Sequence, residues 1–267
     1  MKRNPFTRAM GLGVVALGFA ACADGNAPEA PNALAAAADN HAARAAAAVD
    51  ADLRPDADRA DDALRKPVNV LAFMEIEPGM RVFEMEAGNG YYTELLSALV
   101  GPDGEVVMQN PESFDAFLGD AVTERVNGRL SNVRISKSNF DALDAPDASM
   151  DVVTWVLGPH ELYFELNGAS LGGVEETYAE IVRILKPGGV FIVLDHAARP
   201  GAPETTGGTT HRIDPAIVKA LAANAGLVLA GESDVLRNPD DNYDIGVFDP
   251  SVRRKTDRFL LKYRKPD

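Results

Sequence analysis

The chain has 267 residues, 46% of them hydrophobic and 25% charged, which suffices for one domain with a sizeable core or for one domain with extensions. Its formal net charge of -14 argues against a nucleic-acid partner, because binding polyphosphate relies on clustered lysine and arginine. We therefore expect a small or neutral molecule as the partner.

The first 22 residues have the pattern of an export signal. Lys2, Arg3 and Arg8 accompany an apolar run from 9 to 21, which is shorter than the roughly 20 residues that a membrane-spanning helix needs. The run ends in Phe-Ala-Ala-Cys, which resembles a bacterial lipoprotein lipobox and makes Cys22 the expected lipidation site. An ordinary cleaved secretory signal is the alternative. Both interpretations of this segment predict an exported, periplasmic protein that contacts the membrane only through its N-terminal part.

The next segment, residues 23–59, is rich in alanine, aspartate, asparagine and proline and has few large apolar side chains. It buries too little surface to offset its ordering entropy, so we expect a disordered tether. Its alanine-rich part from 33 to 49 has helical propensity but no apolar stripe with which to dock. The folded domain is therefore expected to span residues 60–267.

Strands and helices alternate along that domain. A helix is expected over 60–76, interrupted at Pro67, and further helices over 92–100, 174–185 and 215–225. Short apolar runs predict strands at 81–85, 105–108, 132–135, 150–157 and 190–194, followed by 227–233 and 256–263. The first five strands alternate with helices, which favours a parallel sheet covered on both faces. The last two have no helix between them and predict an antiparallel hairpin. The expected fold class is a doubly wound, Rossmann-like α/β sheet with an antiparallel C-terminal hairpin.

Several motifs in this order resemble those of class I S-adenosylmethionine-dependent methyltransferases. They are the acidic glycine loop Glu-Met-Glu-Ala-Gly-Asn-Gly at 84–90, Asp-Val-Val at 151–153, and Leu-Lys-Pro-Gly-Gly at 185–189. The resemblance is closer to a subgroup of predicted, exported bacterial methyltransferases. That subgroup shares Asp195-His196, Arg-Asn-Pro at 237–239 and the segment Arg-Arg-Lys-Thr-Asp at 253–257. The resemblance covers residues 60–267.

The resemblance implies a site for S-adenosylmethionine at the carboxyl edge of the sheet, where ligands bind in doubly wound folds. Glu84 would orient the ammonium end of the cofactor, and Ala87, Gly88 and Gly90 would pack against its methionine part. The other residues that we expect at the cofactor are Glu86, Asn89, Tyr92, Gln109, Asn139, Phe140 and Leu157. A plain strand-to-helix turn is the alternative for the glycine loop.

Two of these positions depart from the pattern of the family. Gln109 stands where many members have an acidic residue for the ribose hydroxyls, and an amide makes a weaker bond than a carboxylate. Asn139 and Phe140 occupy the position after the third strand, where the adenine amine would be recognised.

The acceptor side of the site is expected after the fourth and fifth strands. His160 is the candidate general base for an acceptor that carries a proton, and a helix-capping role is the alternative. Candidate substrate-contacting residues are Glu161, Tyr163, His196 and His211. No metal is expected, because the histidines show no pair one helical turn apart and no cysteine supports them.

Two functions fit these residues. One is transfer of a methyl group to an unknown small-molecule or envelope substrate, and the other is non-catalytic binding of a small ligand by a lipoprotein that keeps the fold. A nicotinamide dehydrogenase is disfavoured, because the sequence Gly88-x-Gly90-x-x-Thr93 lacks the third glycine of a dinucleotide loop.

Overall fold

The computed structural model describes residues 31–267. The predicted signal segment and its lipidation site, Cys22, lie outside the described residues. Between residues 31 and 267, no helix combines the length and apolar character that crossing a membrane requires.

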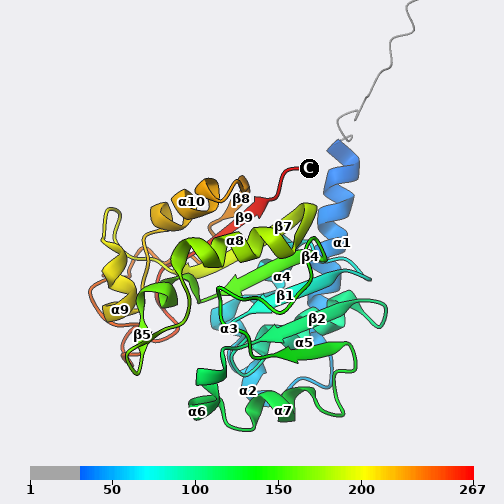
Figure 1. Ribbon diagram of the computed structural model, residues 1–267. Helices are drawn as coiled ribbons and strands as arrows, with labels where there is room; N and C mark the ends of the chain where they lie inside the picture. Colours follow the sequence, from blue (N-terminus) through cyan, green and yellow to red (C-terminus); the bar gives the residue numbers. More distant parts are fainter. Residues whose placement is uncertain (1–30) are drawn as a thin grey trace, which may run out of the picture.

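Seven strands form one sheet in the order β3-β2-β1-β4-β7-β9-β8 (Figure 1). Their bounds are β1 Arg81–Met85, β2 Glu105–Gln109, β3 Val133–Ser136, β4 Met150–Val156, β7 Leu185–His196, β8 Val228–Ser233 and β9 Arg258–Arg264. Strands β3, β2, β1, β4 and β7 are parallel, whereas β9 is antiparallel to both β7 and β8. The predicted fold class is confirmed, including the antiparallel hairpin. A two-stranded hairpin that was not predicted, β5 Glu165–Leu166 with β6 Ala169–Ser170, follows β4.

Helices cover both faces of the sheet. The α-helices are α1 Pro31–Asp50, α2 Asp56–Arg59, α3 Asp62–Arg65, α4 Pro67–Met74, α5 Tyr91–Val100, α6 Asp115–Leu118, α7 Ala121–Val126, α8 Val174–Ile184, α9 Gly207–Thr210 and α10 Pro215–Asn224. The 3-10 helices are η1 Glu112–Phe114, η2 Pro159–Tyr163 and η3 Glu204–Thr206. One apolar core lies between the sheet and α1, α4 and α5, and a second lies between the sheet and α8 and α10 (Figure 1). The two cores hold the strands rigidly, which fixes the loops at their carboxyl ends.

The expected tether is wrong for residues 31–50, which form helix α1 packed on α4 and α5. Ala45, Ala48 and Val49 are buried in this contact. Small side chains permit close approach of two helices, so a stripe of alanine and one valine serves as a docking face without large apolar residues. The guanidinium of Arg44 also donates to the backbone carbonyl of Ile76 at 2.6 Å. The folded part therefore begins well before residue 60.

Candidate active site

A cavity of about 450 Å³ lies at the carboxyl edge of β1, β4 and β7. Most of the predicted site residues line it, namely Glu84, Glu86, Ala87, Gly88, Asn89, Tyr92, Leu157, His160, Glu161, His196 and His211. The order of the strands explains this gathering, because loops that follow neighbouring parallel strands meet at the same edge. Gly90 belongs to the same loop and caps helix α5 directly behind the cavity.

The glycine loop after β1 has a conformation that requires its glycines. Gly88 has φ 58° and Gly90 has φ 87°, both in the left-handed region that favours glycine. A Cβ on Gly90 would lie 2.8 Å from Cγ of Arg125, whereas one on Gly88 would meet no atom within 4 Å. Gly90 is therefore needed for packing, and Gly88 leaves open space on the cavity side of the loop.

Two amides at the C-terminal end of β2, Gln109 and Asn110, hold this loop. Gln109 accepts the backbone N–H of Glu86 at 2.9 Å through its Oε1 and donates from Nε2 to the carbonyl of Ser138 at 2.6 Å. Asn110 accepts from the N–H of Gly88 at 2.8 Å and donates to the same residue's carbonyl at 3.0 Å. Gln109 is fully buried and does not line the cavity. Its expected contact with the ribose is corrected accordingly, because both ends of its side chain bond within the protein.

Glu84 is the buried carboxyl group at the floor of the cavity, with 2% of its surface exposed. The hydroxyl of Thr93 donates to its Oε2 at 2.5 Å. Burial outweighs this bond and the positive charge of Arg125, and raises the pKa of Glu84 to about 8. A cation beside Glu84 would therefore favour ionisation of this carboxyl group.

Glu86, the unusual residue of the loop, also faces the cavity. The indole N–H of Trp155 donates to its Oε2 at 2.8 Å, across the backbone of Gly158. A Cβ on Gly158 would lie 1.7 Å from the indole nitrogen, so that position requires glycine. Burial, followed by repulsion from Glu161, raises the pKa of Glu86 well above its usual range.

Three further predictions are wrong about position. Phe140 is fully buried in the core, where its ring packs 5.0 Å from the ring of Trp155, and Asn139 is exposed beside it, away from the cavity wall. Tyr163 likewise lies outside the cavity wall, because it packs against the short helix α9 at Gly207. The C-terminal ends of the strands were predicted to within two residues, but the direction of each side chain depends on tertiary packing.

His160 lies at the cavity wall with 3% of its surface exposed. Its Nδ1 is 2.8 Å from Oδ1 of Asp195, and its backbone N–H donates to the other oxygen of that carboxylate at 2.9 Å. Burial alone would lower the pKa of His160, but Asp195 and Glu161 raise it to about 10. Beside these two carboxylates a protonated ring cannot accept a further proton, which argues against His160 as the general base; only a cation bound at Nε2 would displace that proton.

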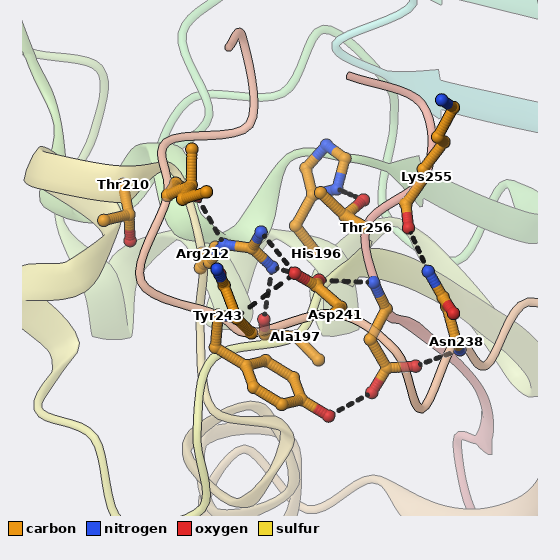
Figure 2. A network of polar contacts seen from close by, with 12 residues as sticks. His196, Ala197, Thr210, Arg212, Asn238, Asp241, Tyr243, Lys255 and Thr256 are labelled. Carbon is orange, nitrogen blue, oxygen red and sulfur yellow. Dashed lines mark hydrogen bonds and ion pairs between the residues drawn. The ribbon is translucent and has the colours of Figure 1, made fainter. Parts of the chain in front are cut away.

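His196 differs electrostatically from His160. Its Nδ1 lies 2.7 Å from the hydroxyl oxygen of Thr256, on the chain segment that leads into β9 (Figure 2). Burial, together with the positive charges of His160 and Arg258, lowers the pKa of His196 well below its usual range. His196 is therefore a neutral imidazole at the cavity wall, with its orientation fixed through Nδ1.

The segment that carries His211 is anchored by a buried ion pair. Arg212 is fully buried and donates to Asp241 at 2.7 Å and to the carbonyl of Ala197 at 3.0 Å (Figure 2). In the same network, Asp257 accepts hydrogen bonds from the guanidinium of Arg237 and from the hydroxyl of Tyr243, each at 2.9 Å. The loop between β8 and β9 thus positions both His196 and His211, which strand patterns alone did not reveal.

Sequence reasoning also missed the apolar wall of the cavity. It consists of Phe114, Phe117, Phe164, Leu166, Val247 and Phe248. Phe117 is 61% exposed and Phe248 is 65% exposed, so an aromatic rim faces solvent at the cavity. These residues come from loops and short elements without regular periodicity, and the only available signal was aromatic side chains in otherwise polar segments.

A smaller cavity adjoins the first and shares five lining residues with it, namely Arg65, Leu157, His196, Val247 and Phe248. Its remaining wall is basic, with Arg253, Arg254 and Arg258. Arg258 is 8% exposed, and within residues 31–267 its Nε has no hydrogen-bond partner and its guanidinium no carboxylate within 4.0 Å. Burial lowers the pKa of Arg258, which reflects the cost of this charge.

Comparisons of the sequence and of the fold with known proteins both point to methyltransferases. Residues 84–193 match a family described as "Methyltransferase domain". The chain is 30% identical over 129 residues to the ubiquinone/menaquinone biosynthesis C-methyltransferase UbiE of Ectopseudomonas mendocina, covering 48% of this chain and 46% of that protein. The corresponding UbiE of Erwinia tasmaniensis is 28% identical over 167 residues and 62% of each chain is covered. The chain therefore spans about half the length of the first of these relatives.

Among solved structures, the crystal structure of a SAM dependent methyltransferase from Aquifex aeolicus is similar in fold. The TM-score is 0.54 at 19% identity, with 76% of this chain and 97% of that chain covered.

Proposed function

We propose that the protein transfers a methyl group to a small apolar acceptor. The premise is its class I S-adenosylmethionine-dependent methyltransferase fold, together with the match of residues 84–193 to a methyltransferase domain. The observation that carries the proposal is Glu84, a buried carboxyl group that faces the cavity beside the glycine loop. A carboxyl group is retained at such a site, at a cost in stability, when a cationic ligand compensates it.

The cavity residues fit S-adenosylmethionine at its positively charged end. The carboxylate of Glu84 would accept from the ammonium group, and the uncrowded side of Gly88 would allow close approach of the methionine part. Ala87 and Leu157 would supply apolar contacts, and Asn89 a polar side chain at the cavity edge. The bound cofactor supplies an electrophilic methyl group on a sulfonium, whose positive charge Glu86 would favour.

The acceptor would occupy the part of the cavity toward the aromatic rim. Phe114, Phe164 and Phe248 offer flat apolar surfaces there, which suits an aromatic or lipid-like acceptor. The UbiE relatives are named as C-methyltransferases of ubiquinone and menaquinone biosynthesis, which agrees with an acceptor of this class. The basic wall of the adjoining cavity, with Arg258 buried in it, favours an acceptor that also carries an anionic substituent.

Methyl transfer depends mainly on alignment of the acceptor atom with the methyl carbon, which the rigid strand ends and the loop would provide. His196 is the candidate to accept the acceptor's proton, because its neutral ring lines the cavity and Thr256 holds it through Nδ1. Its lowered pKa makes it a weak base, so it would take the proton only as the acceptor becomes acidic during methyl transfer. We expect His196→Ala to lower kcat by roughly 10²-fold while the Kd for S-adenosylmethionine stays within about twofold. Unchanged turnover in this variant would exclude the role.

The test of the proposal is calorimetric titration of the protein with S-adenosylmethionine, S-adenosylhomocysteine and NAD. We expect heat with both adenosyl compounds and none with NAD, since the loop lacks the third glycine of a dinucleotide site. Isotope transfer from labelled S-adenosylmethionine to phenols and quinols, with and without carboxylate substituents, then tests the acceptor class. Absence of heat with either adenosyl compound at millimolar concentration would refute the proposal.

We also propose that the protein is exported and carries lipid on Cys22, on the strength of its lipobox-like segment. Cells that express the full chain should incorporate labelled palmitate into it, and Cys22→Ser should abolish the incorporation. Equal labelling of the two forms would rule out lipidation at this residue.

A further inference from the structure

Three side chains of the active-site cavity converge in a way that methyl transfer does not explain. Nε2 of His160 and Nδ1 of His211 each lie 3.3 Å from the same oxygen, Oε1 of Glu161. One nitrogen or oxygen atom from each of the three residues lies within 4.8 Å of the other two. His160 and Glu161 are consecutive in η2, and His211 follows α9, so the fold brings together positions 50 residues apart.

The two separations that involve Glu161, 3.3 Å each, are close to the distance between neighbouring ligand atoms in a coordination polyhedron. Two ligand atoms bound to Zn²⁺ at 2.0–2.1 Å with tetrahedral angles lie about 3.4 Å apart. Nδ1 of His211 is buried and has no hydrogen-bond partner among the described residues, although the carboxylate oxygen of Glu161 is close. A buried nitrogen without a partner is costly, and coordination to a cation would satisfy it.

The outer contacts of His160 are those of a metal ligand. Its Nδ1 contacts Asp195 at 2.8 Å, and the other oxygen of this carboxylate accepts the backbone N–H of His160. This pairing fixes the ring and directs Nε2 into the cavity, as a carboxylate does for many metal-bound histidines. Asp195 itself is fully buried at the end of β7, so the arrangement is rigid.

The position of His211 is also fixed, by a strained backbone conformation and by aromatic neighbours. Its φ of 52° lies in the left-handed region, which a residue with a Cβ adopts only under constraint. The rings of Phe164 and Phe248 flank its ring, with centroids 4.8 Å and 4.9 Å away. Strained backbone and close aromatic packing together fix the direction of Nδ1 toward Glu161.

We infer that His160, Glu161 and His211 form a site for a divalent transition metal of the Zn²⁺ type, with Nε2, a carboxylate oxygen and Nδ1 as ligands. Two histidines and one glutamate leave the fourth position open, as in catalytic zinc sites. The open position faces the same cavity, so an oxygen of the acceptor or a water molecule would complete the coordination. No metal was expected from the sequence, because the histidines show no pair one helical turn apart; here the fold brings His211 to His160 and Glu161 from a distant part of the chain.

The site does not depend on the proposed methyl transfer, since metal binding can be measured without cofactor or acceptor. The full chain, freed of metal with a chelator, is titrated with Co²⁺ and followed by visible absorption, and zinc content is measured by mass spectrometry after reloading. We expect one metal per chain, with micromolar or tighter affinity. His211→Ala and Glu161→Gln should each weaken binding at least 100-fold, and Asp195→Asn by 10- to 100-fold.

A matched control is His41→Ala, because His41 belongs to α1 and contacts Glu77 far from the cavity. This variant should bind Co²⁺ like the unmodified protein. Circular dichroism and the thermal midpoint establish that each variant is folded, and His211, whose side chain is 16% exposed, is the least disruptive ligand to replace. Absence of Co²⁺ absorption in the unmodified protein, or equal affinity in the folded His211→Ala variant, would overturn the inference.

Discussion

Replacing Glu84 by glutamine is expected to stabilise the empty protein while weakening its affinity for S-adenosylmethionine. The carboxyl group is buried at the cavity floor, and burial raises its pKa from 4.5 to about 8. The folded state therefore holds a proton on Glu84 over a pH range in which the unfolded chain has released it. Stability contributed by Glu84 is consequently lost as the pH rises from about 4.5 to about 8.

The size of the effect follows from these two pKa values. Each pH unit of separation corresponds to 1.36 kcal/mol, so the loss reaches about 5 kcal/mol above pH 8 and about 3 kcal/mol at pH 7. Glutamine does not ionise, and its amide oxygen can still accept the hydroxyl of Thr93, which now donates to Glu84 at 2.5 Å. The variant should therefore match the parent near pH 4 and exceed it by several kcal/mol near pH 8.

Urea unfolding at a series of pH values measures the stability difference, and calorimetry measures cofactor binding. Loss of a charged hydrogen bond to the ammonium group should weaken binding by roughly 10- to 100-fold. Binding by the parent protein should release a proton near pH 7, which makes the observed heat depend on the buffer. The matched control is Glu94→Gln, which should destabilise, because Glu94 is buried but paired with Arg125 at 2.6 Å. A stability gain in Glu84→Gln that does not vary with pH would refute the reasoning.

Three other substitutions test separate parts of the structure. Asn110→Ala removes both hydrogen bonds to the backbone of Gly88, so we expect calorimetry to show roughly tenfold weaker cofactor binding. Unchanged affinity would mean that the loop keeps its conformation without Asn110. Arg258→Met removes a buried charge without a carboxylate partner, and with it a hydrogen bond to the carbonyl of Leu64 at 2.7 Å. Because burying the charge is the larger cost, the thermal midpoint should rise, and a fall would contradict this ranking. Ala45→Leu overpacks the buried face of α1 and should lower the free energy of unfolding in urea by about 1–3 kcal/mol. Ala38 is exposed on the same helix, so Ala38→Leu should leave this free energy unchanged. Equal effects of the two substitutions would contradict the docking of α1.

The sheet could be predicted from sequence because its signals are local. Each strand is a short apolar run between turn residues, and the predicted bounds of β1, 81–85, coincide with the observed strand Arg81–Met85. The antiparallel hairpin followed from the lack of a helix between β8 and β9. The docking of α1 was missed because hydrophobic patterns are judged by large side chains, and the buried face of α1 is mainly alanine.

The site was predicted less completely, because residue spacing locates a loop but not the partner of each side chain. Gln109 was placed correctly at the end of β2, yet its amide bonds to the backbone of Glu86 and not toward the cavity. His160 was assigned as a base from its position after β4. The neighbouring carboxylate of Asp195, which changes its protonation, comes from β7 and could not be read from local sequence.

Glu86 shows how a loop can keep its shape without a glycine at a position that favours one. Its φ of 51° lies in the left-handed region, which costs a residue with a Cβ roughly 1 kcal/mol or more. Two contacts offset this cost, since Gln109 accepts the backbone N–H and Trp155 donates to the carboxylate. Both partners lie on neighbouring strands, so the sheet itself holds Glu86 in the strained conformation. The carboxylate is thereby fixed at the cavity wall beside the proposed sulfonium position, which a glycine at this point could not provide.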